Sequence, residues 1–141
     1  MFLSEVNDEL RTLLQSRALG HLVTINADGS PQVSVVWIGF RDDRIVAAHL
    51  GTGQKIKNIA RDPRVALTVE APGVSGPGLA NYLIVHGWAE IIDGGAPQLL
   101  QELAETYLGP GIRFPPMDNP PEGHVISITI ERIGGVGPWS A

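Results

Sequence analysis

The sequence predicts a mainly β fold of the α+β class, a small antiparallel barrel of six strands with a few short helices. Six segments have the apolar pattern of strands, turn residues separate them closely, and only three segments have helical periodicity. The strands expected at 32–40 and 45–50 are joined by a tight polar turn, which leaves no room for the crossover of a parallel unit. A doubly wound parallel sheet is therefore disfavoured.

The first half of the chain begins with a helix over 4–17, where Ser4 is a candidate cap and leucines recur at helical spacing. A strand over 19–26 follows and ends in an Asp28-Gly29 hairpin turn, a pair that tolerates positive φ. The strands at 32–40 and 45–50 come next. A Gly-rich turn then leads into a helix of about two turns, from Gln54 to Arg61, with Thr52 or Gly53 as its cap.

The second half continues with strands and loops in alternation. The remaining elements are a strand at 64–71, a loop at 72–78, a strand at 82–92, a helix at 97–108, a loop at 109–123 and a strand at 124–133. Gly87 lies inside a strand and indicates a bulge or a close backbone contact. The tail, 134–141, holds Trp139, a large aromatic that we expect to dock on this chain or on a second subunit.

Length and composition indicate one domain over 1–141, since 43% of its residues are hydrophobic and can form a core. The net charge of −5 argues against nucleic acid as a partner, because no basic face could neutralise phosphates. The absence of Cys excludes disulfides, thiol catalysis and Cys-ligated zinc. No segment has the pattern of a signal peptide or the length of a membrane span, so a cytoplasmic location is expected.

The segment 51–59 is the strongest candidate binding site. It contains Lys55 and Lys57, the only lysines of the chain, at the start of the predicted helix. Lysine there opposes the helix dipole, whereas a bound anion would reverse that argument. Glycine for close approach, free N–H groups and a lysine are the parts of a phosphate site. The alternative is a solvated helix with two surface lysines.

Other candidate residues carry weaker signals. His49 precedes the Gly-rich turn and is a candidate pocket residue, whereas structural roles are expected for His21 and His124. Trp37 is expected to pack in the core on the side of Val33 and Val35. Trp88 lies on a partly polar strand face that suits an interface or a pocket wall. No catalytic residue and no metal cluster is visible, so a cofactor would supply the chemistry of an enzyme.

Several short motifs occur in an order that resembles a known family. They are Leu22-Val23-Thr24, Asp28-Gly29-Ser30-Pro31-Gln32, Val35-Val36-Trp37, Gln54-Lys55-Ile56-Lys57-Asn58-Ile59, Asp62-Pro63-Arg64-Val65 and Gly87-Trp88-Ala89-Glu90. Over residues 5–133 the chain resembles the pyridoxamine 5'-phosphate oxidase-like split β-barrels, an FMN-binding fold. The branch that it resembles most is the one that binds the deazaflavin coenzyme F420.

The resemblance implies a homodimer with two cofactor sites at the subunit interface. Gln54, Lys55 and Asn58 would hold the cofactor phosphate, and Lys57 would meet the cofactor tail or solvent. The strand residues implied beside the tricyclic ring are Ser34, Val35, Val36, Trp37, His49 and Leu50. The partner subunit would close the site with Tyr82, Trp88 or Trp139, and substrate shape would be set by the loops 72–80 and 109–123.

Two departures from the family separate its branches. The flavin-using oxidases carry an Arg early in the second strand, where this chain has Gln32-Val33-Ser34. They also carry Arg-Gln in the fifth strand, where this chain has Asn81-Tyr82. Both differences argue against pyridoxamine phosphate oxidation and weaken the case for flavin mononucleotide (FMN).

The expected function is therefore an F420-dependent oxidoreductase that transfers a hydride to a small unsaturated or carbonyl-containing substrate. Two alternatives stay open. One is an FMN-binding oxidoreductase of the same fold. The other is a non-catalytic protein that carries or sequesters a cofactor or haem.

Overall fold

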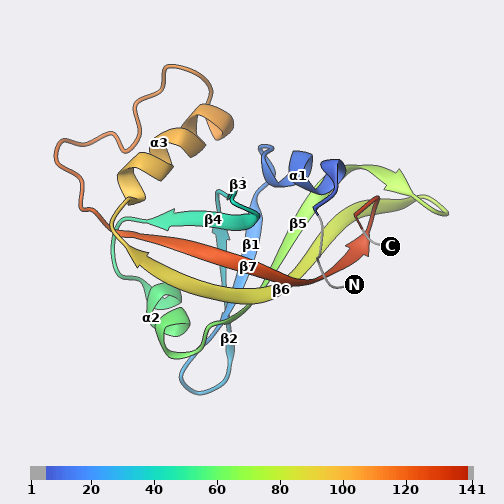
Figure 1. Cartoon of the computed structure of the whole chain (residues 1–141), viewed down its shortest axis with the longest axis horizontal. Helices are drawn as coiled ribbons and strands as arrows, with labels where there is room; N and C mark the ends of the chain where they lie inside the picture. The colour runs from blue at the N-terminus through green and yellow to red at the C-terminus, as the bar shows by residue number, and fades with distance from the viewer. Residues whose placement is uncertain (1–5, 140–141) are drawn as a thin grey trace.

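The computed structural model describes residues 6–139, which form one curved antiparallel sheet and three helices (Figure 1). The elements are α1 (Asp8–Leu14), β1 (Gly20–Ile25), β2 (Pro31–Val36), β3 (Gly39–Arg41), β4 (Arg44–His49), α2 (Gln54–Arg61), β5 (Arg64–Ser75), β6 (Leu79–Asp93), α3 (Ala96–Tyr107) and β7 (His124–Val136). The strand order is β2-β1-β5-β6-β7-β4-β3. The predicted split-barrel class is confirmed, with seven strands in place of six.

The additional strand arises because the strand expected over 32–40 is two strands. β2 ends at Val36 and β3 begins at Gly39, and the two lie at opposite edges of the sheet. Between them the N–H of Ile38 donates to the hydroxyl of Tyr107 at 2.9 Å. This bond takes Ile38 out of the ladder, so the chain leaves β1 and crosses to pair with β4.

The segment 72–78, expected to be a loop, mostly belongs to a long hairpin. β5 continues to Ser75 and β6 begins at Leu79, with a register shift between Glu70 and Val74. The side chain of Asn81 holds the shifted segment, because it accepts from the Ser75 hydroxyl at 2.6 Å and donates to the Pro72 carbonyl at 3.2 Å. Side-chain bonds that the composition does not reveal therefore keep a Pro- and Gly-rich segment in the sheet.

The first helix is shorter than the sequence predicts. Asn7 is its cap, because the side-chain oxygen of Asn7 accepts from the N–H of Leu10 at 2.8 Å. Ser4, the expected cap, lies outside the described residues. Leu10, Leu13 and Leu14 are buried and close one end of the core.

Gly87 and Trp139, both singled out from the sequence, make close contacts within the chain. The ladder between β6 and β7 shifts at Gly87, and a side chain there would collide with the carbonyl oxygen of Thr129. The predicted bulge and close contact are thus both present. Trp139 is buried in its own chain, where its indole N–H donates to the carbonyl of Tyr82 at 3.1 Å.

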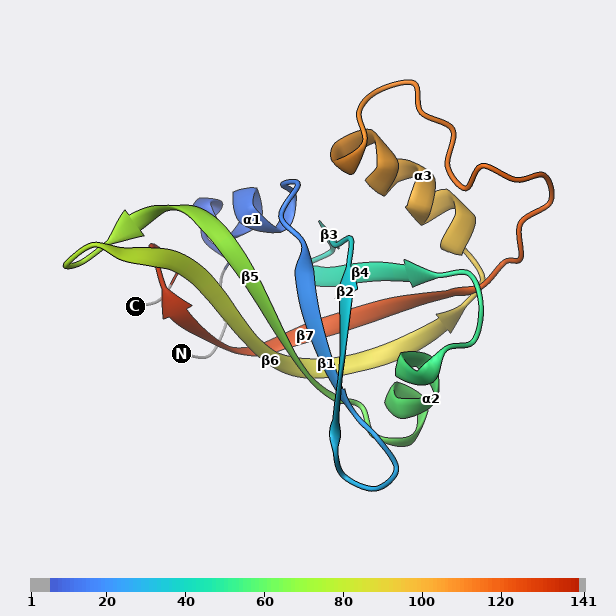
Figure 2. The ribbon, with the colours of Figure 1, turned by 180° about the vertical axis from the view of Figure 1, so that it is seen from behind.

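The face of β2 that carries Val33 and Val35 is not the core face that we expected. Val33 is 60% exposed and Val35 is 56% exposed, whereas Val36 and Ile38 point into the core. The exposed face continues across β1, β5 and β6 to Trp88. β2 is an edge strand, and among the described elements no helix covers this side of it (Figure 2).

The two remaining helices, α2 and α3, lie at the end of the sheet opposite α1 and the tip of the β5–β6 hairpin (Figure 1, Figure 2). α2 follows β4, and α3 joins β6 to β7 through the loop 109–123. α3 packs its Leu99 and Leu103 on Val46 and Val125. Within residues 6–139, no helix is long and apolar enough to cross a membrane.

Candidate functional site

A cavity of about 240 Å³ opens where the ends of β2 and β4 meet α2 and α3. Four residues of its wall were predicted from the sequence, and they are Val35, Val36, Trp37 and Lys55. Four more were not, and they are Ala48, Leu100, Leu103 and Phe114. The cavity is therefore apolar and aromatic on most sides, with a single cationic side chain at one of them.

Lys55 is that cation, in the first turn of α2. Its side chain is half-buried, and burial lowers the pKa of the ammonium group. The ion pairs formed among residues 6–139 do not include Lys55. Gly53 caps the helix without a side-chain hydrogen bond, and no acidic residue lies in the first turn. A half-buried lysine beside a helix start that has no side-chain cap suits an anionic group.

Asn58, expected to touch the cofactor phosphate, has another role in the fold. Its amide nitrogen donates to Thr24 at 3.0 Å and to Asn26 at 2.9 Å. Its amide oxygen accepts from Gln54 at 2.8 Å and from Arg61 at 3.2 Å. These four bonds use the full capacity of a buried amide. Asn58 therefore fixes α2 on the β1–β2 hairpin, and its side chain has no hydrogen-bonding group left for a phosphate.

The polar network around Asn58 also includes Ser34. The Thr24 hydroxyl donates to Gln32 at 3.0 Å, and the amide of Gln32 donates to the hydroxyl of Ser34 at 3.2 Å. Ser34, Gln54 and Asn58, three of the predicted site residues, thus belong to one chain of hydrogen bonds behind the helix start. None of the three lines the cavity.

His49 lies between the cavity and the helix start. Its Nε2 atom faces the backbone of Gly53, so closely that a Cβ added there would lie 2.9 Å away. Burial lowers the pKa of His49, and the charges of Lys55 and His124 lower it further. The ring is therefore neutral at pH 7 and adds no second positive charge next to Lys55. Leu50, which follows it, is half-buried and does not line the cavity, and Lys57 is exposed.

Two aromatic rings, Trp37 and Phe114, line one side of the cavity, and Tyr107 supports them. Trp37 stacks on Tyr107 with 5.2 Å between ring centroids and 10° between planes. Phe114 packs on Trp37 at 5.1 Å and 52°. The hydroxyl of Tyr107 donates to the carbonyl of Ala18 at 2.6 Å, and burial raises the pKa of that hydroxyl. The wall is thus fixed to the sheet at one end by Tyr107.

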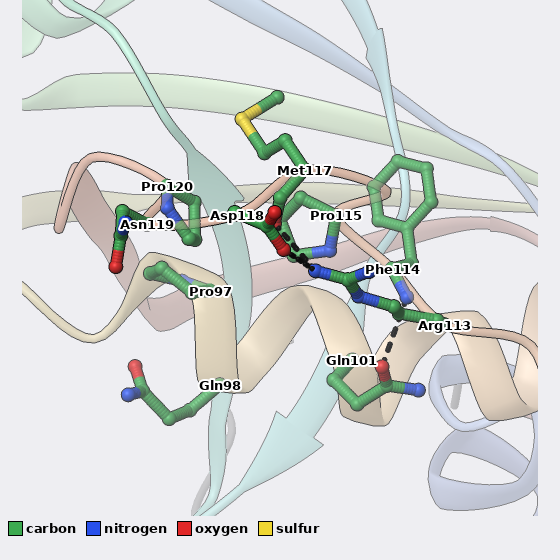
Figure 3. A pocket seen from close by; sticks show the side chains of 10 residues that line it. All are labelled: Pro97, Gln98, Gln101, Arg113, Phe114, Pro115, Met117, Asp118, Asn119 and Pro120. Carbon is green, nitrogen blue, oxygen red and sulfur yellow. Dashed lines mark hydrogen bonds and ion pairs between the residues drawn. The ribbon is translucent and has the colours of Figure 1, made fainter.

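A larger open groove of about 760 Å³ adjoins the cavity. It runs between the first half of α3 and the loop 113–120, and Figure 3 shows the side chains that line it. Phe114 belongs to both the groove and the cavity, so the two hollows share this one ring. An occupant of the groove would lie next to an occupant of the cavity.

Three of the four residues that the sequence did not predict come from α3 and from the loop that follows it, and the fourth, Ala48, lies on β4. Leu100 and Leu103 have the spacing of helical core residues, and nothing in that pattern distinguishes a cavity wall from the core. Phe114 gave one usable signal, because a large aromatic in a Pro- and Gly-rich loop is costly to leave in water. Its target could not be read from the sequence.

The family model described as pyridoxamine 5'-phosphate oxidase matches residues 6–137. A curated relative, the 5a,11a-dehydrotetracycline/5a,11a-dehydrooxytetracycline reductase of Streptomyces rimosus, is 27% identical over 101 residues, covering 69% of this chain and 71% of the relative.

Two solved structures are similar to this chain over most of its length. An F420 reductase superposes with a TM-score of 0.73 at 26% identity, covering 92% of this chain and 98% of its own. A conserved hypothetical protein of Mycobacterium tuberculosis superposes with a TM-score of 0.72 at 24% identity, covering 94% of this chain and 84% of its own. The second likeness concerns the fold alone.

Proposed function

The chain belongs to the pyridoxamine 5'-phosphate oxidase family, and we propose that it is an oxidoreductase that binds reduced F420 and works as a homodimer. The observation that carries this proposal is Lys55, a half-buried cation whose charge no acidic side chain of residues 6–139 pairs, set in an aromatic cavity. Its surroundings fit a ligand that joins a flat ring to a phosphate. The structural likeness to an F420 reductase supports F420 as that ligand.

Each part of the site has a task in this proposal. Lys55 and the backbone N–H groups at the start of α2 would hold the phosphate. Val35, Val36 and Trp37 would lie along the ring and keep water from it. Ser34, Gln54 and Asn58 would support this arrangement from behind, through the hydrogen bonds that join α2 to β1 and β2. His49 and Leu50 would border the ring, and Lys57 would face the cofactor tail or solvent.

The chemistry that reduced F420 supplies when bound is hydride donation, which together with a solvent proton reduces a conjugated C=C or C=O bond. The contribution of this chain is orientation and exclusion of water. No carboxylate lines the cavity, and we assign no catalytic acid or base to the chain. The name of the Streptomyces rimosus relative, a reductase of dehydrotetracyclines, supports an unsaturated carbonyl compound as the acceptor.

A second copy of the chain would complete the site. The exposed face of the sheet carries Val33, Val35, Tyr82 and Trp88, with Val23, Ala66 and Ile84 half-buried between them and the polar side chains of His21, Thr68 and His86 interspersed. Several large apolar side chains exposed on one sheet face are costly in water and suit a subunit interface. Because Val35 also lines the cavity, a partner on this face would close the cavity from the β2 side.

A side-by-side titration tests the cofactor. Purified protein is titrated with F420 and with FMN while cofactor fluorescence is followed, and its own absorption spectrum is recorded first. We expect the tighter binding for F420, followed by oxidation of reduced F420 when an α,β-unsaturated ketone is added. Tighter binding of FMN would favour the FMN-dependent alternative, which the family description also supports. A haem spectrum, or F420 binding without turnover, would favour a carrier.

A further inference from the structure

The middle of the loop 109–123 is joined to α3 by the side chain of Gln101. Its Nε2 atom donates to the carbonyl of Ile112 at 2.8 Å, and its Oε1 atom accepts from the N–H of Phe114 at 2.9 Å. The amide thus bonds to the backbone on both sides of Arg113, as a neighbouring strand would. Figure 3 shows Gln101 on α3 directed at the loop, with its bond to Phe114 drawn.

At the far end of the loop the N–H of Ala96, the first residue of α3, donates to the carbonyl of Glu122 at 3.0 Å. The other side-chain hydrogen bonds of the loop close it on itself. Arg113 pairs with Asp118 at 2.7 Å and donates to the carbonyl of Met117 at 3.0 Å. Both side chains are exposed, and exposed ion pairs stabilise a fold little. The Gln101 bond to Phe114 is part-buried, where such bonds are stronger. Gln101 therefore supplies the bonds that hold the middle of the loop, at Ile112 and Phe114, on the helix.

The position of Phe114 depends on this fastening. Its backbone N–H is held by Gln101, and its ring packs on Trp37 at 5.1 Å. The same ring separates the cavity of Lys55 from the groove beside α3. A displacement of the loop would move Phe114 away from Trp37 and join the two hollows into one wider space.

We propose that Gln101 is a positioning residue that holds Phe114 against Trp37 and so sets the width of the cavity that receives a flat ring. This inference rests on the proposed function, because the ring in question is that of F420. Gln101 touches neither the ring site nor Lys55 and acts through the loop backbone. It determines which planar ligands fit, whereas Lys55 determines that they carry a phosphate.

The first test needs no ligand. Gln101→Leu removes both hydrogen bonds at nearly constant volume. Gln98→Leu is the matched control, one turn earlier on the exposed side of α3, where the described residues offer its side chain no hydrogen bond. We expect Gln101→Leu to weaken the near-ultraviolet circular dichroism of the Trp37 stack, and Gln98→Leu to leave it unchanged. Identical spectra for Gln101→Leu and the wild type would overturn the proposal.

The second test uses two probes. One is F420, and the other is its ring fragment without phosphate and tail, the deazaflavin FO. The Gln101→Leu variant should bind FO roughly tenfold more weakly than the wild type, because it lacks the two hydrogen bonds that order the loop. Gln98→Leu should bind FO within twofold of the wild type. In a Phe114→Leu background the change Gln101→Leu should add nothing, because the two residues act as one unit.

The outcomes separate the two proposals. If the wild type binds neither probe, the proposed function fails and this use of Gln101 fails with it. If the wild type binds both and Gln101→Leu binds FO equally well, or the two substitutions are additive, only the positioning role is overturned. Should Gln101→Leu not fold, Gln101→Glu replaces it. Its carboxylate still accepts from Phe114 but cannot donate to Ile112, so FO binding should again be weaker than in the wild type.

Discussion

The imidazole of His49 packs directly on the backbone of Gly53, with Nε2 at 2.9 Å from the place where a β-carbon of residue 53 would lie. Gly53 has φ −95°, which any residue can adopt, so the requirement for glycine at this helix cap comes from the histidine ring. The last residue of β4 and the cap of α2 therefore have to be considered together.

Gly53→Ala should displace the His49 ring and disturb the helix start that we propose for the phosphate. We expect roughly a fivefold loss of F420 affinity, with a small fall in Tm because Ala is a poorer cap than Gly. The control is Gly51→Ala, where the added β-carbon would lie 4.0 Å from His49. Equal affinities for both variants in a fluorescence titration would show that the ring does not order this turn.

Lys55→Met should make the protein more stable and less able to bind. Its ammonium is half-buried and its pKa is lowered by burial, so the charge costs stability that a thioether would not. We expect Tm to rise by roughly 1–3 °C, while F420 affinity falls roughly 10- to 150-fold with loss of a charge-assisted contact. Lys57→Met, at the other lysine, removes an exposed charge, so it should leave Tm unchanged and lower F420 affinity much less than Lys55→Met does. Scanning calorimetry and a titration of both variants give the comparison.

Asn58→Ala should destabilise the fold more than any other substitution in the predicted site. It leaves the buried hydroxyl of Thr24 and the half-buried side chain of Asn26 without their partner, at a cost of roughly 2–4 kcal/mol. Gln54→Ala, which removes one exposed member of the network, should cost under about 1 kcal/mol. Urea unfolding measures both. Similar urea midpoints for the two variants would mean that the whole network stabilises the fold no more than the single bond between Gln54 and Asn58 does.

The pH dependence of stability should include a contribution from His49. Its pKa in the fold lies below its ordinary value of 6.5, so the unfolded chain binds more protons between these two values. The contribution of His49 to the free energy of unfolding is therefore fully present above pH 6.5 and is lost as the pH drops toward the folded-state pKa. The charged groups that face His49 are Lys55 and His124, and His124 in turn lies 3.1 Å from Asp93. His49→Gln should flatten the curve of unfolding free energy below pH 6.5, where the unfolded chain binds the additional proton. An unchanged slope would contradict this assignment.

Val33→Glu should convert the proposed dimer to a monomer. Two copies of a carboxylate would be buried on an apolar face whose opposing surface is the same in each subunit. Val74→Glu is the matched control, since Val74 is 67% exposed and lies on the far part of the β5–β6 hairpin. Light scattering after gel filtration measures the molar mass of the wild type and of each variant. A wild-type monomer, or a dimer of Val33→Glu, would exclude this face as the interface.

The sequence predicted best where local chemistry decides the structure. The bounds of α2 agree with the prediction because glycine precedes the helix and Asp62-Pro63 ends it. The hairpin at Gly29, with φ +88°, follows from the Asp-Gly pair. Lys55 could likewise be singled out, since its charge at a helix start is anomalous wherever the helix lies.

The features that could not be predicted depend on residues far apart in the chain. The split of the strand at Ile38 depends on Tyr107, and the cavity wall at Phe114 depends on Gln101 of the preceding helix. Asn58 matched a motif, but only the fold shows that its four bonds are used internally. A motif identifies a position, and its neighbours in space decide what the side chain does there.

The place of β7 between β6 and β4 has a consequence for biosynthesis. β3 and β4 pair with the rest of the sheet only through β7, which spans His124–Val136 near the end of the chain. A nascent chain that stops short of these residues can form the hairpins of β1 with β2 and of β5 with β6, but leaves β4 without its neighbour. The ligand cavity, which needs Ala48 beside Trp37, should thus assemble only once β7 has emerged from the ribosome.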